Sequence, residues 1–345
     1  MSHQYFSLAI GVGSKNQKGQ WLEVFYPNPV LNPDSALLEK ISSLVGYTGG
    51  NQSIELDSKT LHALEDLFVD NKETTLATIT RSLEESAQPR VITILETDDA
   101  PTSTPEAYLK LHLLSHRLVK PHGVNLQGIF PLLPNVAWTN EGAVDLEELP
   151  ARQLQARAEG RLLSVNSVDK FPKMTDYVVP AGVRIAHTAR VRLGAYVGEG
   201  TTIMHEGFIN FNAGTEGTSM IEGRVSAGVM VGKGSDLGGG CSTMGTLSGG
   251  NNIVISVGEN CLIGANAGLG IPLGDRCIIE AGLYLTAASK VQILDDKKTV
   301  VEVIKAGDLA GKSDLLFRRN SLTGAIECLT NKSAIELNDE LHSHN

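Results

Sequence analysis

The chain has 345 residues, with 29 Lys or Arg and 39 Asp or Glu, so its formal net charge is −10 at pH 7. A hydrophobic fraction of 41% excludes a disordered chain, and the length predicts two or three domains. The acidic balance, without a Lys/Arg-rich run, argues against nucleic-acid binding. No stretch resembles a membrane span or a secretory signal, and the four cysteines lack metal-site spacing. We expect a cytoplasmic protein with reduced thiols and no membrane partner.

The first 172 residues predict an α/β domain without a catalytic motif. Asp34 is a suitable N-cap and Gly46 a suitable C-cap for one helix, and Val91–Leu95 is typical of a buried strand. The expected apolar stripe of that helix is Leu38, Ile41, Leu44 and Val45. The other expected elements are a helical stripe at Leu61, Leu64 and Phe68, a helix from Thr104 through Leu118, a Pro-rich connection at 131–134 and a bridging helix within 147–161.

After residue 175 aliphatic residues recur at every sixth position. They are Val179, Ile185, Val191, Val197, Ile203 and Ile209, and the register returns at Val225–Leu237, Val257–Leu269 and Leu273–Val291. A six-residue period is typical of hexapeptide β-helices, in which three hexads close a triangular coil and the aliphatic residues point inward. We therefore predict a mainly β chain, with a left-handed parallel β-helix at 173–293. It would lie between the N-terminal α/β domain at 1–172 and a short C-terminal extension at 294–345, where Thr299–Ile304 predicts a strand.

Two segments interrupt this register, at 210–224 and at 245–252. Both are rich in Gly, Asn, Ser and Thr, as loops are. Loops that leave a solenoid often carry binding groups, so we expect both segments to protrude from the prism and to contribute to a site.

Four runs of the sequence are specific enough to indicate a family. Residues 204–214, 217–228, 245–250 and 264–271 resemble the longer-chain branch of the tetrahydrodipicolinate N-succinyltransferase family, within a resemblance that is dense from about 177 to 321. The resemblance implies transfer of a succinyl group from succinyl-CoA to the amine of 2-amino-6-oxopimelate, the opened form of tetrahydrodipicolinate, in lysine and diaminopimelate biosynthesis. It also implies a homotrimer with active sites at the subunit boundaries. The alternatives are an acetyl-CoA-dependent acetyltransferase for the same amine and a non-catalytic trimeric scaffold.

By the family motif Glu222 is the catalytic residue. One route has Glu222 attack the thioester to form a mixed anhydride, and the other has it take a proton from the substrate ammonium. The sequence leaves both routes open. A carboxylate at a prism corner is also often only a solvated turn residue, since Glu222 follows Ile221 just as Glu280 follows Ile279.

The remaining candidate residues would bind the two small molecules. Arg224 is expected to pair with a carboxylate of the dicarboxylate amine or of the succinyl group, because guanidinium binds carboxylate bidentately. Ser219 and Asn212 offer neutral hydrogen bonds beside it. The residues that the motif assigns to the pantetheine arm are Gly239, Ser242, Ala265, Glu280 and Ala281, and those assigned to the nucleotide end are Lys305, Arg318, Arg319, Asn320 and Ser321.

Glu206 matches a family position for a divalent cation, thought to be Mg²⁺, near the trimer axis. Three copies of one carboxylate would repel each other, and a hard cation with oxygen ligands relieves that repulsion. His187 and His205 are eighteen residues apart, which is one full coil, so they should stack. A zinc hydrase would need three converging imidazoles, and the repeat region contains only these two.

Overall fold

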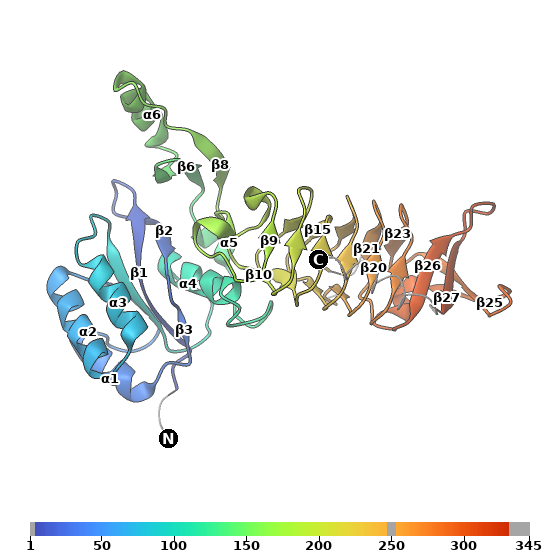
Figure 1. The fold of residues 1–345 in the computed structure, drawn as a ribbon, viewed down its shortest axis with the longest axis horizontal. Helices are drawn as coiled ribbons and strands as arrows, with labels where there is room; N and C mark the ends of the chain where they lie inside the picture. The colour runs from blue at the N-terminus through green and yellow to red at the C-terminus, as the bar shows by residue number, and fades with distance from the viewer. Residues whose placement is uncertain (1–3, 247–252, 331–345) are drawn as a thin grey trace. The chain divides into compact units, whose positions relative to one another are not determined.

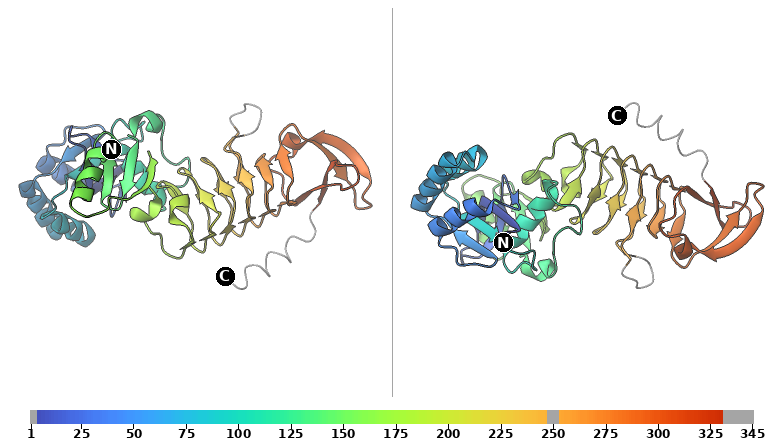
Figure 2. Two further views of the ribbon diagram at one scale, coloured as in Figure 1. Left: turned by 90° about the horizontal axis from the view of Figure 1, so that it is seen from above. Right: turned by 90° about the horizontal axis from the view of Figure 1, so that it is seen from below.

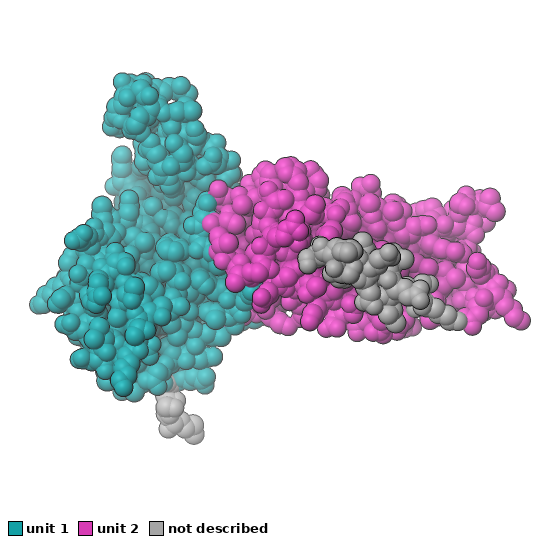
Figure 3. Space-filling view, in the orientation of Figure 1, with its two compact units in different colours: residues 1–118, 123–172, 176–178 teal, residues 119–122, 173–175, 179–345 magenta. Residues whose placement is uncertain are grey.

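The computed structural model describes residues 4–246 and 253–330. The chain divides into two compact units (Figure 3). The first unit comprises residues 1–118, 123–172 and 176–178, and the second comprises residues 119–122, 173–175 and 179–345. No helix within the described ranges is long and apolar enough to cross a membrane.

An antiparallel sheet lies at the centre of the first unit, with strand order β2-β1-β5-β4 and β3 paired to β1. Its strands are β1 (Ser7–Lys15), β2 (Trp21–Phe25), β3 (Val30–Leu31), β4 (Gln52–Glu55) and β5 (Arg90–Leu95). Helices α1 (Ser35–Val45), α2 (Ser58–Asp70) and α3 (Thr74–Leu83) cover one face (Figure 1). Helix α4 (Thr104–Ser115) contacts β2 and β5, and all of its residues are buried.

The predicted helix signals of this unit are confirmed. The Asp34 carboxylate accepts a hydrogen bond from the Leu37 N–H at the start of α1, and Gly46 ends the helix in the left-handed region with φ 71°. The predicted apolar stripe of α1 is wrong at Leu44, which is 41% exposed. The helix predicted from Thr104 through Leu118 is α4, which ends at Ser115, so Leu118 lies beyond it.

A second, smaller sheet in the first unit was not predicted. Strands β6 (Val136–Thr139), β7 (Gly142–Asp145) and β8 (Val165–Asp169) pair in the order β7-β6-β8, after the short helix α5 (Ile129–Leu132). Helix α6 (Leu149–Ala158) connects β7 to β8, which confirms a helix within 147–161. The strands are four or five residues long, β6 is wholly buried, β7 has one buried residue and β8 is largely exposed, so they carry little hydrophobic periodicity.

The second unit is the parallel β-helix that the six-residue period predicts (Figures 1 and 2). Face 1 consists of β10 (Ala195–Val197), β13 (Ala213–Thr215), β16 (Met230–Val231) and β19 (Ser256–Val257). Face 2 consists of β9 (Arg184–Ile185), β11 (Thr202–Ile203), β14 (Met220–Ile221), β17 (Asp236–Leu237), β20 (Leu262–Ile263), β22 (Ile278–Ile279) and β26 (Leu315–Arg319). Face 3 consists of β12 (Phe208–Ile209), β15 (Arg224–Val225), β18 (Ser242–Thr243), β21 (Gly268–Gly270) and β23 (Tyr284–Thr286).

Each face contributes one column of inward side chains. On face 2 the column runs through Ile203, Ile221, Leu237, Ile263, Ile279 and Phe317, all of them fully buried. Stacking these coils removes from water an apolar surface that no single coil could bury. The first predicted member is wrong, since Val179 is 71% exposed and the face 2 pairing begins at Ile185.

The segment 210–224 is not a protruding loop, which corrects the first predicted interruption. It forms β13 and β14 within the coil, with Thr215 and Ile221 as fully buried inward residues. The register was hidden for two reasons. Thr215 is polar, with its hydroxyl 2.7 Å from the Thr201 hydroxyl, and the next inward residue, Val225, follows Ile221 after four positions instead of six.

The second predicted interruption lies between β18 and β19. At its ends Thr246 and Val254 form an isolated antiparallel bridge. Residues 247–252 of this predicted loop lie outside the described residues. After β23 the chain forms β24 (Lys290–Leu294), β25 (Val300–Lys305) and β27 (Ile326–Thr330), which extend the sheet of face 2. The strand predicted at 299–304 is thereby confirmed.

Candidate active site

The corner joining face 2 to face 3, here called the 2–3 corner, aligns seven of the fifteen predicted site residues. The inward residues of face 2 are in register from coil to coil, so the positions after them stack. One column holds Glu222, Gly238, Gly264, Glu280 and Arg318, and the next holds Gly223, Gly239, Ala265, Ala281 and Arg319. Neighbouring parallel strands lie about 4.8 Å apart, so four coil steps place Glu222 and Arg319 roughly 19 Å apart along the prism axis.

At Glu222 this corner is two residues shorter than in the coil before it and the coil after it. Ile203 and Ile209 are six residues apart and so are Leu237 and Thr243, whereas Ile221 and Val225 are four apart. The tight passage needs glycine: a methyl group on Gly223 would lie 2.3 Å from Cys241 Sγ and 2.6 Å from the Cys241 carbonyl oxygen. The short corner therefore packs directly onto the next coil.

The Glu222 carboxylate is half-buried and has neither a hydrogen-bond partner nor an ion-pair partner among the described residues. Its backbone is fixed, because its N–H donates to the Leu237 carbonyl oxygen at 2.8 Å. A methyl group on Gly239 would lie 3.5 Å from Glu222 Oε2, so the carboxylate lies beside the small residue of the next coil. Burial and then the charge of Glu222 raise the pKa of the Cys241 thiol to about 12. Cys241 is therefore a packing residue rather than a nucleophile.

A stripe of small residues with free amides continues from Glu222 along the corner. Within residues 4–246 and 253–330, the N–H groups of Gly239, Ala265 and Ala281 have no hydrogen-bond acceptor. The carbonyl oxygens of Gly239 and Ala265 accept hydrogen bonds from the Asn266 N–H at 2.9 Å and the Gly282 N–H at 2.8 Å. Within the described residues, the stripe thus offers three donors without a partner and no bulky side chain beside them. Sequence reasoning missed these donors, because residue type does not reveal which N–H lacks a partner.

Arg224 and Ser242 lie side by side on face 3, next to the short corner. They are paired in register on β15 and β18. Arg224 is exposed, and its guanidinium has no partner in the described part of the chain. It is therefore available to a ligand carboxylate beside Glu222.

The predicted position of Ser219 and Asn212 beside Arg224 is wrong for a single chain. Ser219 lies between face 1 and face 2, is 1% exposed and donates its hydroxyl hydrogen to the Gly217 carbonyl oxygen at 3.2 Å. Asn212 lies between face 3 and face 1 in a left-handed turn with φ 51°, and its Oδ1 accepts a hydrogen bond from the His122 N–H at 2.8 Å. Ser219 and Asn212 thus lie at two other corners of the prism, where they stabilise turns.

The predicted nucleotide-binding residues divide into two groups. Arg318 and Asn320 both bind the Glu327 carboxylate, with Arg318 Nε 2.9 Å from Oε2 and Asn320 Nδ2 2.7 Å from Oε1. Glu327 is buried, and its pKa is lowered by the hydrogen bond from Asn320 and then by Arg318. The exposed residues are Lys305, Arg319 and Ser321, and the Glu280 carboxylate accepts the Arg319 N–H at 2.7 Å. The cations at the surface are therefore those of Lys305 and Arg319.

Comparisons with known proteins identify the family of the chain. Two family models match, described as tetrahydrodipicolinate N-succinyltransferase middle, at residues 133–173, and hexapeptide repeat of succinyl-transferase, at residues 254–287. A 2,3,4,5-tetrahydropyridine-2,6-dicarboxylate N-succinyltransferase of Pseudomonas paraeruginosa is 69% identical over 345 residues, covering 100% of both chains. The chain belongs to the tetrahydrodipicolinate N-succinyltransferase family.

Other members of the family support the same conclusion. The Vibrio cholerae enzyme of the same name is 59% identical over 341 residues, covering 99% of both chains. A Campylobacter jejuni crystal structure, titled as a 2,3,4,5-tetrahydropyridine-2-carboxylate N-succinyltransferase, has a TM-score of 0.88 and 30% identity, covering 96% of this chain and 94% of that one. The left-handed β-helix predicted from the hexads is the fold of this chain.

The Mg²⁺ that the tetrahydrodipicolinate N-succinyltransferase resemblance implies at Glu206 does not fit the residues of one chain. Glu206 supplies a single carboxylate, and Arg190 already lies beside it, with Nη2 2.9 Å from the Glu206 carbonyl oxygen and 3.4 Å from Oε2. A neighbouring guanidinium opposes cation binding at the same oxygen. His187 and His205 lie one above the other as predicted, with ring centroids 5.1 Å apart in an edge-to-face arrangement.

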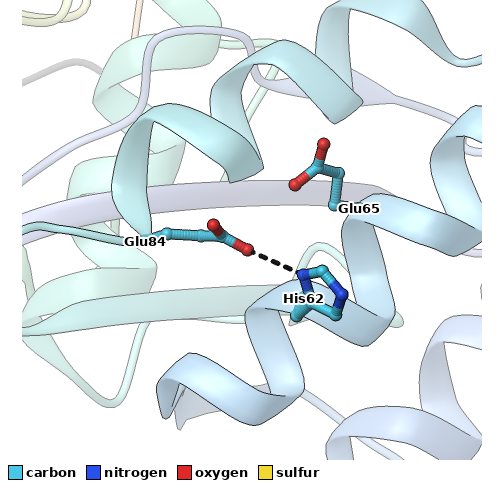
Figure 4. A group of neighbouring side chains, drawn as sticks. All are labelled: His62, Glu65 and Glu84. Atoms are coloured by element: carbon cyan, nitrogen blue, oxygen red, sulfur yellow. Dashed lines mark hydrogen bonds and ion pairs between the residues drawn. The ribbon is translucent and has the colours of Figure 1, made fainter.

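Within the described ranges, one group of side chains has three ligand atoms close enough for a metal ion, and it lies in the first unit of this family member (Figure 4). His62, Glu65 and Glu84 have ligand atoms within 4.8 Å of one another. Arg81 Nε already lies 2.6 Å from Glu65 Oε1, and the hydrogen bond to Glu84 is the main cause that raises the pKa of His62. The group is accounted for as an exposed ion-pair network between α2 and α3.

Proposed function

We propose that this chain transfers the succinyl group of succinyl-CoA to the amine of 2-amino-6-oxopimelate, with Glu222 as the catalytic residue. The amine nitrogen forms a bond to the thioester carbonyl carbon, the carbon–sulfur bond breaks, and CoA leaves as the thiol while the amine loses a proton. The observation that carries the proposal is the unpaired carboxylate at the head of a stripe of free amides. A thioester laid along that stripe would have its carbonyl next to Glu222.

In this arrangement the free amides of Gly239, Ala265 and Ala281 bind the carbonyl oxygens of the pantetheine arm. Donors fixed by the backbone need no reorganisation when negative charge develops on the thioester oxygen. Donors preorganised at that oxygen lower the barrier of acyl transfer most. Lys305 and Arg319 meet the phosphates at the far end of the stripe, and Arg224 takes the carboxylate of the succinyl group or of the amine substrate.

The test measures steady-state release of CoA thiol by variants in which one carboxylate is replaced by the amide of the same size. Glu222→Gln keeps the volume and removes the base, so we expect kcat to fall by about 10²- to 10⁴-fold. The control is Glu259→Gln, because Glu259 is exposed at the corner between face 1 and face 2. Full turnover in Glu222→Gln, with normal thermal unfolding, would remove the catalytic role.

The two routes for Glu222 differ in what happens without the amine. A mixed anhydride predicts a burst of free thiol, close to one equivalent per site, when enzyme meets succinyl-CoA alone. Proton abstraction by Glu222 predicts no burst, because the amine itself must attack the thioester. The same assay with acetyl-CoA tests the choice of acyl group: a preference for acetyl-CoA indicates the acetyltransferase, and no thiol from either donor indicates a scaffold.

We also propose a homotrimer in the cytoplasm. The support is the exposed and unpaired Arg224, which a neighbouring chain would enclose, and four cysteines that are all buried free thiols, as expected in a reducing compartment. Native mass spectrometry should give three times the chain mass of 36.8 kDa. Mg²⁺ at Glu206 requires three copies of that carboxylate, so a metal content well below one ion per trimer would exclude it. We also propose three domains, at 1–172, 173–293 and 294–345. The change of element type near residue 173 and near residue 294 supports these boundaries.

A further inference from the structure

A cleft of about 400 Å³ lies in the first unit, and the acyl transfer proposed above does not use it. Its wall comes from the turn after β1, the start of β2, the start of α4, the segment after α5, the end of β7 and the residue after β8. The volume is within the range of small-molecule sites, which lies between about 300 and 1,000 Å³. The cleft therefore forms between the two sheets of one compact unit.

Two opposite charges line this cleft, and neither forms a salt bridge with a described residue, although the charge of Lys18 also acts on Asp145. Asp145 accepts hydrogen bonds from Asn16 Nδ2 at 2.7 Å and from the Glu147 N–H at 2.9 Å, but it forms no salt bridge with any described residue. Lys170 donates from Nζ to the Leu133 carbonyl oxygen at 2.6 Å and likewise has no carboxylate partner in the described ranges. Each charged group keeps unused hydrogen-bonding capacity.

The carboxylate of Asp145 is held in place and charged. Its pKa is lowered, first by the hydrogen bond from the Asn16 side chain and then by the Glu147 N–H. Asn16 is itself 8% exposed and also donates to Gln20 Oε1 at 2.9 Å, so it fixes Asp145 from the floor of the cleft. Such a carboxylate is preorganised to accept an ammonium group.

A third polar group and an apolar surface complete the lining. Thr104 is 9% exposed, and neither its hydroxyl nor its N–H has a partner among the described residues. Both groups can therefore hydrogen-bond to a ligand in the cleft. Trp21 and Pro131 also line the cleft, and they offer apolar surface to a side chain.

We infer that the first unit carries a second ligand site, which binds a small zwitterion of the α-amino acid class. The ammonium group pairs with Asp145, the carboxylate pairs with Lys170 and the side chain packs on Trp21. An anion or a cation alone would leave one of the two charges in the cleft unpaired, so the zwitterion is the class that satisfies both. The test of this site does not depend on the acyl transfer, because ligand binding is measured without turnover.

The experiment is isothermal titration of the full chain with the common α-amino acids, each at about 10 mM, enough to saturate a site with a Kd near 1 mM. For an amino acid that binds, two analogues follow: its amide, which lacks the carboxylate, and its α-hydroxy acid, which lacks the ammonium. Each analogue should bind at least about tenfold more weakly, the difference expected for a lost charge-assisted contact. If no amino acid binds, or if both analogues bind as well as the parent, the inference is wrong.

Variants of the cleft give the matched test. Lys170→Gln keeps a donor for the Leu133 carbonyl oxygen and Asp145→Asn keeps an acceptor for the Glu147 N–H, so both should fold while losing at least about tenfold in affinity. Lys170→Arg restores the charge and should restore binding. Lys59→Gln and Asp70→Asn change exposed charges on α2 and should leave binding unchanged. Unchanged binding in both cleft variants would overturn the assignment.

Discussion

Replacing Gly223 by alanine tests whether the short corner at Glu222 packs as described. The added methyl group would lie 2.3 Å from Cys241 Sγ and 2.6 Å from the Cys241 carbonyl oxygen, whereas carbon atoms make ordinary contact at about 3.5 to 4.0 Å. Sγ would have to move by more than about 1 Å, and Cys241 is 1% exposed, so little space is available to it. The carbonyl belongs to the backbone and accepts the Arg224 N–H at 2.8 Å, so moving it would break that bond.

Overpacking of this kind costs about 1 to 3 kcal/mol. For a unit of this size each kcal/mol lowers Tm by about 2 to 4 °C, so we expect Gly223→Ala to unfold about 2 to 12 °C below the parent. Thermal and urea unfolding, followed by circular dichroism, measure the loss. Adding Cys241→Ala removes the sulfur clash but leaves the carbonyl clash, so it should recover only part of the stability.

The control is Gly239→Ala, one coil further along the same column. Its added methyl group would meet its nearest neighbour, Glu222 Oε2, at 3.5 Å, which is ordinary contact. We expect a change in stability within about 0.5 kcal/mol, together with weaker binding of succinyl-CoA, because the methyl narrows the stripe beside Glu222. If Gly223→Ala is as stable as Gly239→Ala, the reasoning about the short corner is refuted.

Three further results are expected. Arg318→Ala leaves the buried Glu327 carboxylate short of a partner and should cost about 1 to 3 kcal/mol in urea unfolding, whereas Arg319→Ala should raise KM for succinyl-CoA without that loss; the reverse pattern would exchange their roles. The four buried thiols should react with a disulfide reagent only after unfolding, and fast labelling of the folded chain would contradict their burial. Burial lowers the pKa of His112 to about 3, so between pH about 6.5 and 3 the unfolded chain binds a proton that the folded chain excludes, and the free energy of unfolding falls by about 1.4 kcal/mol per pH unit as pH drops. A urea midpoint with the same pH dependence in His112→Gln as in the parent would exclude this assignment.

The fold was largely predictable because one hexad carries its own register. An inward aliphatic residue every six positions defines three faces without any long-range information, and capping residues such as Asp34 and Gly46 mark helix ends locally. The prediction failed where the register depends on a neighbouring coil. Thr215 is polar and inward because Thr201 binds its hydroxyl, and the short step from Ile221 to Val225 is allowed because Gly223 fits against Cys241.

For the candidate site, the sequence proposes residues, whereas the structure decides which of them lie together. Motif resemblance singled out Glu222 and the small residues Gly239 and Ala265, and the shared corner then follows from the pairing of the coils. Sequence could not assign Asn212 to another corner, nor pair Arg318 with Glu327, because both contacts depend on residues distant in the chain. An Arg pair in a tail looks the same whether its cations face solvent or a buried carboxylate.

The alignment of Glu222 with Arg319 along one edge makes their separation depend on the number of coils between them. If succinyl-CoA lies along this edge as proposed, the length of its site is a whole number of coil steps and does not depend on loop conformation. Deleting one coil, for example by joining Ile263 directly to the residue after Ile279, would shorten the separation of Glu222 and Arg319 by about 4.8 Å while leaving the coil of Glu222 unchanged. A solenoid can thus change the reach of its site by gaining or losing one repeat, a step that few globular enzymes have available.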